Sequence, residues 1–490
     1  MQGFGSLLSS CLIRRLGASG LLLPALLAVQ FAHAQSPGAA QRAVEQAKKF
    51  AGATLTVEWQ AGLQSLDLLN YSGPLWEQLT GVKIKVVEIP INEVFSKIVI
   101  EHRAGTGTFD VVDVVPAWTP DLVRMGALEP LDPFIDRFGF REELSGIAPA
   151  FRDYMTVDGR IYSIFDDGDV LLLYYRKDIF ARPEIRKGFR EKFGYELAPP
   201  SDWKQFSEIG GYITETLAAE GIYGATLARE PVFAGYLFQE RFRNEGGKFF
   251  DPATMKATVN STIGAQVFAG MRADNRFMPR GVEQLNFVDN LAVFLAGNAA
   301  MTVSWPPVGR WAAGYGEGEK ALSWVPKSKV AGKVGYALPP LGRPELAIGH
   351  SLAVASASRN KELAWLFIQW LNSEEMSLKR VQLPYTLRDP FRTSHFRSAE
   401  YMSRWPDAKE YLATLKSASE RGLIDLSLIQ TEKYEEALRD GLSRLWGGED
   451  PQKILDEVAR RWDQATERIG IDRQRAAYAS WAAKRGAYPR

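Results

Sequence analysis

The sequence has one cysteine and four histidines among its 490 residues. The cysteine, Cys11, lies in an N-terminal segment that we predict to be removed, so the mature chain would carry no thiol. Without thiols there are no disulfides, no Cys-ligated zinc or iron–sulfur cluster and no cysteine nucleophile. The remaining histidines, His102, His350 and His395, lie far apart, and a catalytic zinc site built on three imidazoles would need all of them. We expect no metal ion and no cofactor.

The sequence also lacks a large excess of charge and, after the N-terminal segment, long apolar runs. No later stretch reaches the roughly 18 uncharged apolar residues that span a bilayer. The 59 basic and 58 acidic residues nearly cancel. Because no strongly basic stripe is present, nucleic acid is not an expected partner. These absences leave a large soluble protein that either binds a small molecule or works as an enzyme through carboxylates or serine.

The first 34 residues have the three parts of a secretory signal peptide. Arg14 and Arg15 form the basic start, residues 21–29 form the apolar core, and Ala32-His33-Ala34 forms an A-x-A cleavage site. An exported protein without disulfides suits the bacterial periplasm, where a large core provides stability. The pattern does not decide between general and twin-arginine export.

From Leu55 onward, strand-like runs alternate with helical patterns. Residues 54–59 and 82–86 alternate as strands, Asn92 and Gly105 bound a helix, and residues 109–115 form a nearly continuous apolar strand. Strand, helix and strand within about 35 residues predict a parallel sheet covered by helices. Further strands are expected at 161–165, 170–175, 299–303 and 352–355, with helices beginning near Asp202 and at Ser358. No linker separates two halves, so we expect two lobes joined by several crossings.

One candidate for a binding site is an acidic run between two predicted strands. Asp166, Asp167 and Asp169 follow the strand at 161–165 and precede the strand at 170–175. Such a run is often a solvated turn, but loops on a rigid scaffold are also where binding residues lie. The carboxylates could accept hydrogen bonds from hydroxyl groups or pair with a cation such as a polyamine.

Three tryptophans stand at the ends of predicted strands, namely Trp59, Trp118 and Trp305. Tryptophan is usually part of a core or of a partly buried surface. At a strand end its face could instead cover the apolar C–H face of a sugar, while nearby carboxylates accept hydrogen bonds from the hydroxyl groups. The three positions therefore favour a sugar or a related hydroxylated ligand.

A secreted hydrolase is the alternative from another class. Residues 349–353 (GHSLA) resemble the G-x-S-x-G nucleophile elbow, and Asp389 and His395 follow Ser351 in the order of an α/β-hydrolase triad. An elbow serine, however, lies between a strand and a helix, whereas here a strand-like run follows the serine. A glycosidase pair of carboxylates also stays open, because such pairs are recognised by their separation in space. We favour binding without catalysis.

Several segments share their order with a known family. They are 109–115 (FDVVDVV), 158–164 (DGRIYSI), 173–180 (LYYRKDIF), 294–302 (FLAGNAAMT) ahead of Trp305, 334–341 (VGYALPPL), 351–354 (SLAV) and 360–365 (NKELAW). In this order the chain resembles the bacterial extracellular solute-binding proteins of family 1, typified by maltose-binding protein. It departs from the family pattern at Phe165, at Gly349-His350 and in a longer, basic C-terminal tail.

The resemblance implies the architecture and the partners. It implies an α/β periplasmic-binding-protein fold of two lobes, each a sheet flanked by helices and discontinuous in sequence. The first lobe would comprise residues 51–168 and 352–422, and the second residues 169–351 and 423–470. The tail at 471–490 would be a surface helix or a disordered end, with partner contact as the minor alternative. The closed form would dock, as a monomer, on a membrane permease driven by a separate ATPase.

The resemblance also implies a ligand site between the lobes. By position it points to Trp59, Gln60, Trp118, Asp169, Glu230, Phe233, Trp305 and Tyr434. Asp167 of the acidic run and His350, beside the expected hinge, complete the candidate ligand-binding residues. The expected ligand is a sugar, polyol or related hydroxylated solute. The alternatives are a polyamine or other cationic solute and, from the other class, a serine or glycoside hydrolase.

Overall fold

The computed structural model describes residues 38–346 and 349–489. The predicted signal peptide at 1–34 lies outside the described residues. All the elements below belong to one unit, Gly38–Arg490. Across the described ranges, no helix is both long enough and apolar enough to cross a membrane.

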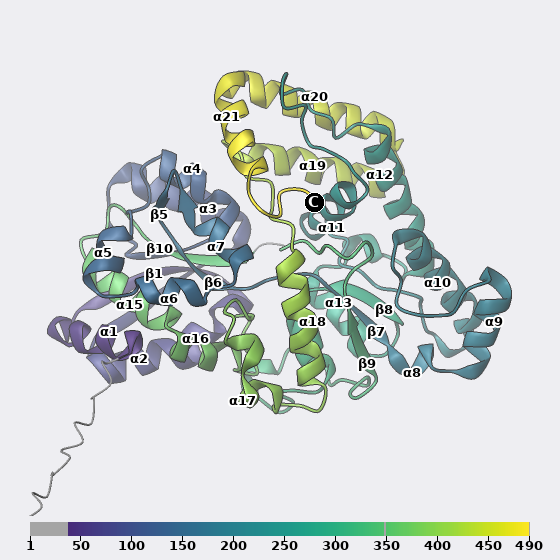
Figure 1. Cartoon of the computed structure of the whole chain (residues 1–490), viewed down its shortest axis with the longest axis horizontal. Coiled ribbons are helices and arrows are strands. Elements are labelled where there is room, and N and C mark those ends of the chain that lie inside the picture. The colour runs from purple at the N-terminus through teal and green to yellow at the C-terminus, as the bar shows by residue number, and fades with distance from the viewer. Residues whose placement is uncertain (1–37, 347–348, 490) are drawn as a thin grey trace, which may run out of the picture. The chain divides into compact units, whose positions relative to one another are not determined.

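The first sheet has five strands in the order β2-β1-β3-β10-β6. Figure 1 labels β1, β6 and β10 of this sheet. The strands are β1 (Thr54–Gln60), β2 (Lys83–Ile89), β3 (Val111–Val114), β6 (Ile164–Asp167) and β10 (His350–Val354). β1 is parallel to β2 and β3, whereas β10 is antiparallel to β3 and β6. All residues of β3, β6 and β10 are buried, as in strands covered on both faces.

Helices pack on this sheet and on one another. α2 (Gly73–Thr80) contacts β2, α3 (Ile91–Ala104) contacts β1 and β3, and α15 (Lys361–Asn372) contacts β6 and β10. α1 (Ala39–Ala47) lies against α15, and α7 (Pro149–Met155) contacts β6. The other helices in this part of the chain are α4 (Thr119–Arg124), α5 (Asp132–Arg137), α6 (Arg141–Gly146) and α16 (Glu374–Val381).

A second sheet has the order β8-β7-β9, with β7 (Leu172–Arg176), β8 (Met301–Ser304) and β9 (Val334–Ala337) all antiparallel. α13 (Phe287–Leu295), α14 (Pro307–Ala312) and α18 (Ala408–Arg421) pack against its strands. The neighbouring helices are α8 (Lys177–Phe180), α9 (Pro183–Phe193), α10 (Trp203–Thr216) and α17 (Ala399–Met402). A small hairpin pairs β4 (Thr156–Val157) with β5 (Arg160–Ile161).

A group of helices from two distant parts of the chain packs together. It consists of α11 (Pro231–Asn244), α12 (Thr262–Asp274), α19 (Thr431–Trp446), α20 (Pro451–Ile469) and α21 (Ile471–Ala482). Tyr478 and Trp481 of α21 are buried, and Trp481 Nε1 donates a hydrogen bond to the Asp425 carbonyl at 2.7 Å. The tail that was expected to be a surface helix or a disordered end is therefore a helix with one face in the core.

Three chain segments connect the elements of the two sheets. Residues 168–171 join β6 to β7, residues 338–349 join β9 to β10, and residues 422–430 lead from α18 to α19. Leu171 N donates to the Glu345 carbonyl at 3.0 Å, and Leu346 N donates to the Leu423 carbonyl at 2.8 Å. The resemblance implies lobe boundaries at 168/169, 351/352 and 422/423; the first and third fall within such a segment, whereas the second falls within β10. The division into lobes stays a prediction, and α18, which it assigned to the first lobe, packs on β7 and β9 of the second sheet.

Two predicted helix starts differ from the structure. α3 begins at Ile91, so Asn92 lies in the first turn rather than at the cap. Ser358 does not cap α15, because the helix begins later and its N-cap is Asn360; the Ser358 hydroxyl donates to Asp110 at 2.6 Å and accepts from Asn360 N at 3.0 Å. At the other end of α3, Gly105 adopts the left-handed conformation of a C-cap, with φ of 62°, as predicted.

Candidate functional site

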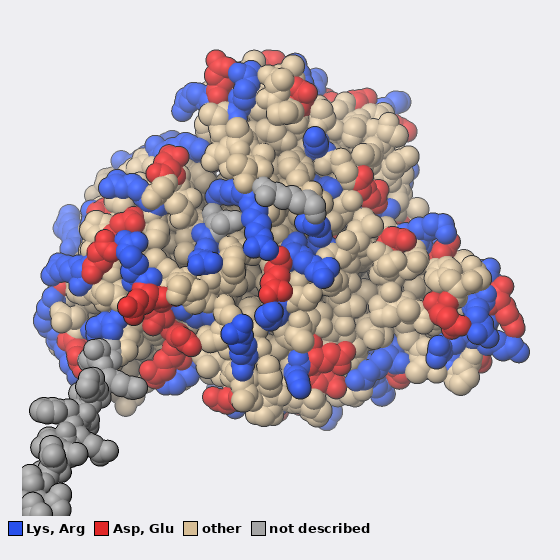
Figure 2. Space-filling model, in the orientation of Figure 1, with Lys and Arg blue, Asp and Glu red and all other residues tan. Residues whose placement is uncertain are grey.

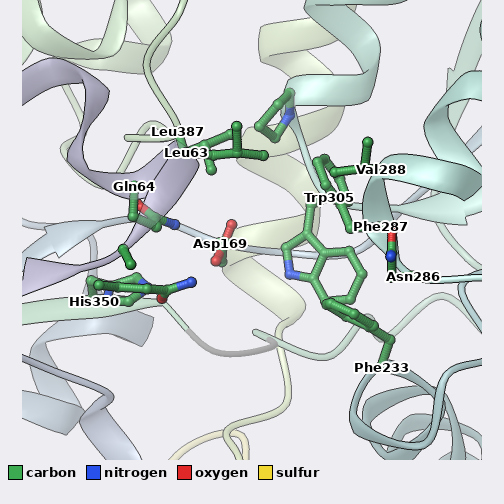
Figure 3. Close-up of a pocket in the computed structure, with 13 residues that line it drawn as sticks. Leu63, Gln64, Asp169, Phe233, Asn286, Phe287, Val288, Trp305, His350 and Leu387 are labelled. Atoms are coloured by element: carbon green, nitrogen blue, oxygen red, sulfur yellow. The ribbon is translucent and has the colours of Figure 1, made fainter. Parts of the chain in front are cut away.

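A pocket of about 230 Å³ lies where loops that follow several strands converge (Figure 3). Gln60 ends β1, Asp169 follows β6, Trp305 follows β8 and His350 begins β10. The complete lining is Gln60, Ala61, Leu63, Gln64, Asp169, Phe233, Asn286, Phe287, Val288, Trp305, Pro307, His350 and Leu387. In α/β proteins, ligands bind at the ends of strands in this way.

Trp305 forms the aromatic wall of the pocket. Phe233, Phe287 and Tyr236 meet its ring edge-on, with ring centroids 5.4, 5.9 and 6.3 Å away. Tyr174 Oη donates a hydrogen bond to the Trp305 carbonyl at 3.0 Å, which fixes the backbone at this strand end. The ring orientation is thus set by surrounding aromatic groups before any ligand enters.

The opposite side of the pocket carries polar groups. Figure 3 shows Asp169 between Gln64 and His350 on one side and Trp305 on the other. Gln64 Oε1 accepts a hydrogen bond from Arg388 at 2.7 Å, and His350 Nδ1 lies 3.1 Å from Asp113 Oδ1. Within the described part of the chain, the buried Gln60 Oε1 and His350 Nε2 have no hydrogen-bond partner. Two unused polar atoms in an apolar pocket are groups that a polar ligand can satisfy.

A network of buried charges lies behind the polar side. Arg388 Nε is 2.9 Å from Asp166 Oδ2, and its guanidinium also reaches Asp167 at 3.5 Å and Asp113 at 3.7 Å. Burial alone would raise the pKa of Asp113, but His350 and Arg388 hold it below its ordinary value. His350 and Arg388 together thus favour the charged form of this carboxyl, which in turn holds His350 in place.

Asp169 has a different electrostatic environment from that of Asp113. Burial raises its pKa well above the ordinary value, and the carboxylates of Asp167 and Asp389 raise the pKa further. The backbone N–H of Gly349 donates to Asp169 Oδ2 at 3.2 Å and partly offsets the effect. Asp169 therefore lines the pocket as a carboxyl that resists ionisation.

Five of the predicted site residues line this pocket: Gln60, Asp169, Phe233, Trp305 and His350. Trp59 does not, because side chains alternate along β1 and its ring lies under the Arg388 guanidinium, 4.8 Å from the ring centroid. Trp118 packs in a separate apolar cluster, with its ring 5.7 Å from that of Phe95.

Three further predicted residues also lie outside the lining. Asp167 is buried in the charge network, where its Oδ1 accepts a hydrogen bond from Asp389 N at 2.7 Å. Glu230 is the N-cap of α11, and only Phe233 of that segment reaches the pocket. Tyr434 is buried between α19, α20 and α21, where its hydroxyl accepts a hydrogen bond from Gln474 at 2.6 Å.

Gln64, Asn286 and Phe287 line the pocket but were not among the residues predicted from the sequence. Asn286 caps α13 by accepting a hydrogen bond from Asp289 N at 3.0 Å, and Phe287 is the next residue. For Asn286 and Phe287, the sequence signal is a helix-cap residue followed by an aromatic residue at the start of an apolar helix. Gln64 lies on a short 3₁₀ helix (Gly62–Ser65) that directly follows β1.

The residues of the possible hydrolase triad are not arranged as an elbow. Ser351 is buried within β10 rather than on a turn between a strand and a helix. His395 Nε2 lies 3.0 Å from Ser377 Oγ, and its Nδ1 accepts hydrogen bonds from backbone N–H groups. Among the described residues, His395 thus makes its hydrogen bonds with Ser377 and the backbone and not with Ser351.

Comparison with known proteins assigns this architecture to a family. Residues 52–377 match the family model described as bacterial extracellular solute-binding protein. A probable ABC transporter-binding protein of Deinococcus radiodurans is 27% identical over 355 residues, which are 68% of this chain and 75% of that protein. A mannitol-binding protein of Pseudomonas aeruginosa is 21% identical over 339 residues, which are 66% of this chain and 69% of that protein.

Solved structures share the fold. A maltose-bound MalE3 of T. maritima superposes with a TM-score of 0.69 and 21% identity, covering 84% of this chain and 100% of that chain. A solute-binding protein of Agrobacterium vitis with bound D-mannitol gives a TM-score of 0.68 and 20% identity, covering 86% and 99%. The two-lobed α/β fold of periplasmic binding proteins is therefore the fold of this chain.

Proposed function

The chain belongs to the bacterial extracellular solute-binding proteins, and from this premise we propose that it captures a sugar, polyol or related hydroxylated solute in the pocket at Trp305. The pocket chemistry carries the proposal. An aromatic face suits the C–H face of such a solute, and the unused polar atoms of Gln60 and His350 suit its hydroxyl groups. The mannitol- and maltose-binding relatives favour the same class of ligand.

Delivery to a membrane permease completes the proposed function. The Deinococcus relative carries the name of an ABC transporter-binding protein, and we infer that this chain hands its solute to the permease of such an importer. We further propose that residues 1–34 direct export, that cleavage falls near Ala34, and that the mature protein works in the periplasm as a monomer without catalysis.

A thermal-shift screen tests the ligand class. A ligand that binds only the native state raises the melting temperature, by an amount that grows with its concentration. We expect D-mannitol, ribitol, maltose or a related compound to raise it, and spermidine and amino acids to leave it unchanged. A shift with spermidine alone would replace the hydroxylated ligand by a cationic one. Turnover of a chromogenic ester or glycoside would replace binding by hydrolysis.

A further inference from the structure

Asp169, which lines the pocket, lies close to two other buried carboxyl groups. Ligand-type oxygens of Asp167, Asp169 and Asp389 all lie within 4.8 Å of one another, and all three residues are buried. Asp389 Oδ1 is 3.1 Å from Arg310 Nη2, and Asp167 accepts hydrogen bonds from Asp389 N and Gln64. Asp169 forms no ion pair with any lysine or arginine among the described residues.

The surrounding charges do not balance if every carboxyl is ionised. Three buried guanidinium groups, those of Arg310, Arg380 and Arg388, form ion pairs with five buried carboxyls: Asp67, Asp113, Asp166, Asp167 and Asp389. Asp169 is a sixth buried carboxyl close to them. Even if His350 is counted as a cation, negative charges would remain in excess. Like-charged carboxylates at such separations and away from water cannot all ionise, so one of them retains a proton.

We propose that Asp169 and Asp389 share one proton in the ligand-free protein, so that Asp169 meets the ligand as an uncharged acid and the pocket selects neutral hydroxylated solutes over cations. This inference rests on the proposed function, because it concerns the same pocket. Gly349 N holds one oxygen of Asp169, which leaves the other to share the proton with Asp389. Burial and the neighbouring carboxylate Asp167 raise the pKa of both groups, which favours retention of the proton.

The groups that face the pair explain why a proton, rather than a metal ion, fits between them. The guanidinium groups of Arg310 and Arg388 already lie beside Asp389 and Asp167. His350 lies across the pocket floor, and the phenols of Tyr174, Tyr401 and Tyr411 face Asp389 from neighbouring elements. A metal cation at this point would stand close to two fixed positive charges.

Infrared spectroscopy of the ligand-free protein tests the shared proton directly. At neutral pH the wild type should show the C=O band of a protonated carboxyl that is lost in Asp169→Asn, whose amide can donate to Asp389 in place of the proton. In Asp389→Asn the band should titrate at a lower pH, by about one pH unit or more, because the ionised Asp169 no longer faces a charged partner. Asp110→Asn, which changes a buried aspartate on another hydrogen-bond network, should leave the band in place.

Calorimetry with D-mannitol and spermidine tests the selection. D-mannitol affinity in the wild type should fall from neutral to alkaline pH, and this pH dependence should disappear in Asp169→Asn. An absent band, a band removed by Ca²⁺, or spermidine binding at neutral pH that Asp169→Asn abolishes would overturn the inference. A protein that shows the band but binds neither compound would contradict the proposed ligand class and not the shared proton.

Discussion

Trp305 is the largest side chain that lines the pocket, and its ring is held by the edges of Phe233, Phe287 and Tyr236. Trp305→Ala removes the face against which a neutral solute would stack. We expect binding to weaken by about 1–3 kcal/mol, comparable to the burial of a large apolar side chain. Calorimetry on the ligand found by thermal shift measures the change, with Trp118→Phe, outside the pocket, as the control. Unchanged affinity in a folded Trp305→Ala protein would remove Trp305 from the site.

A second prediction at the residue scale concerns Arg388. Its guanidinium contacts Asp113, Asp166 and Asp167, and none of these side chains reaches solvent. Arg388→Met leaves the carboxylates without this cation, so we expect the free energy of unfolding to drop by about 3–5 kcal/mol. Urea unfolding measures the drop, and Arg473→Met on the exposed face of α21 should have little effect. Equal stability of the two variants would show that the network does not depend on Arg388.

Strand geometry was enough to predict some of the residues that line the pocket, whereas Phe233 of α11 came from the family resemblance. Gln60 and Trp305 stand at strand ends, and strand ends converge in an α/β fold. Trp59 does not line the pocket with Gln60, because neighbouring residues of a strand face opposite sides. Gln64 and Asn286 depend on how loops fold back over the strands, which local periodicity does not contain. Tyr434 was placed by family position, but the long C-terminal segment folds over it and Gln474 takes its hydroxyl.

At the scale of elements, α21 is a structural part of the fold rather than a free tail. Trp481 and Tyr478 are buried, and Arg243 Nη1 donates to the carbonyls of Ile424 and Ala487 at 2.7 and 2.8 Å. Trp481→Ala should cost about 3–5 kcal/mol of unfolding free energy, because it opens a cavity among aromatic rings. Thermal or urea unfolding measures this cost, with the exposed Arg473→Ala as the control. A change below about 1 kcal/mol would mean that α21 does not stabilise the core.

Another buried acidic cluster, formed by α11 and two of the connecting segments, makes stability depend on pH. Arg243 forms an ion pair with Glu345, and its charge also acts on Glu240 and Asp425. Burial is the main reason that the pKa of each of the three acids is raised. An acid with a raised folded pKa stabilises the protein fully below its unfolded pKa, near 4, and this contribution is lost as pH rises toward the folded pKa. The cluster should therefore lower the free energy of unfolding between about pH 5 and about pH 8.

Glu240→Gln isolates that contribution. The amide cannot ionise, so the variant should lose less stability than the wild type between the two pH values, as measured by urea unfolding. Asp113, whose pKa is lowered, acts in the opposite direction but is common to both proteins and cancels in the comparison. Parallel pH profiles for wild type and Glu240→Gln would show that Glu240 does not titrate on unfolding.

At the scale of the whole molecule, local patterns and family resemblance predicted different parts of the fold. The apolar run at 109–115 and the period of α3 predicted β3 and its covering helix, because each depends on nearby residues. The pairing of β10 with β3 joins residues such as Ser351 and Val114, far apart in the chain, and was not predicted; the resemblance implied only that residues 352–422 belong to the first lobe. The packing of α18 on the second sheet followed from neither.

The three connecting segments motivate a final prediction, that ligand brings the two sheets with their helices closer together. Residues 168–171, 338–346 and 422–430 are few, and small changes in their dihedral angles can rotate one set of elements against the other. Gln60 and Gln64 come from the first sheet's part of the chain and Trp305 from the second, so a ligand that contacts both stabilises the closed form. Small-angle scattering of the mature protein should give a smaller radius of gyration at saturating ligand. Trp305→Ala at the same ligand concentration should show less compaction, and an unchanged profile of the saturated wild type would contradict closure.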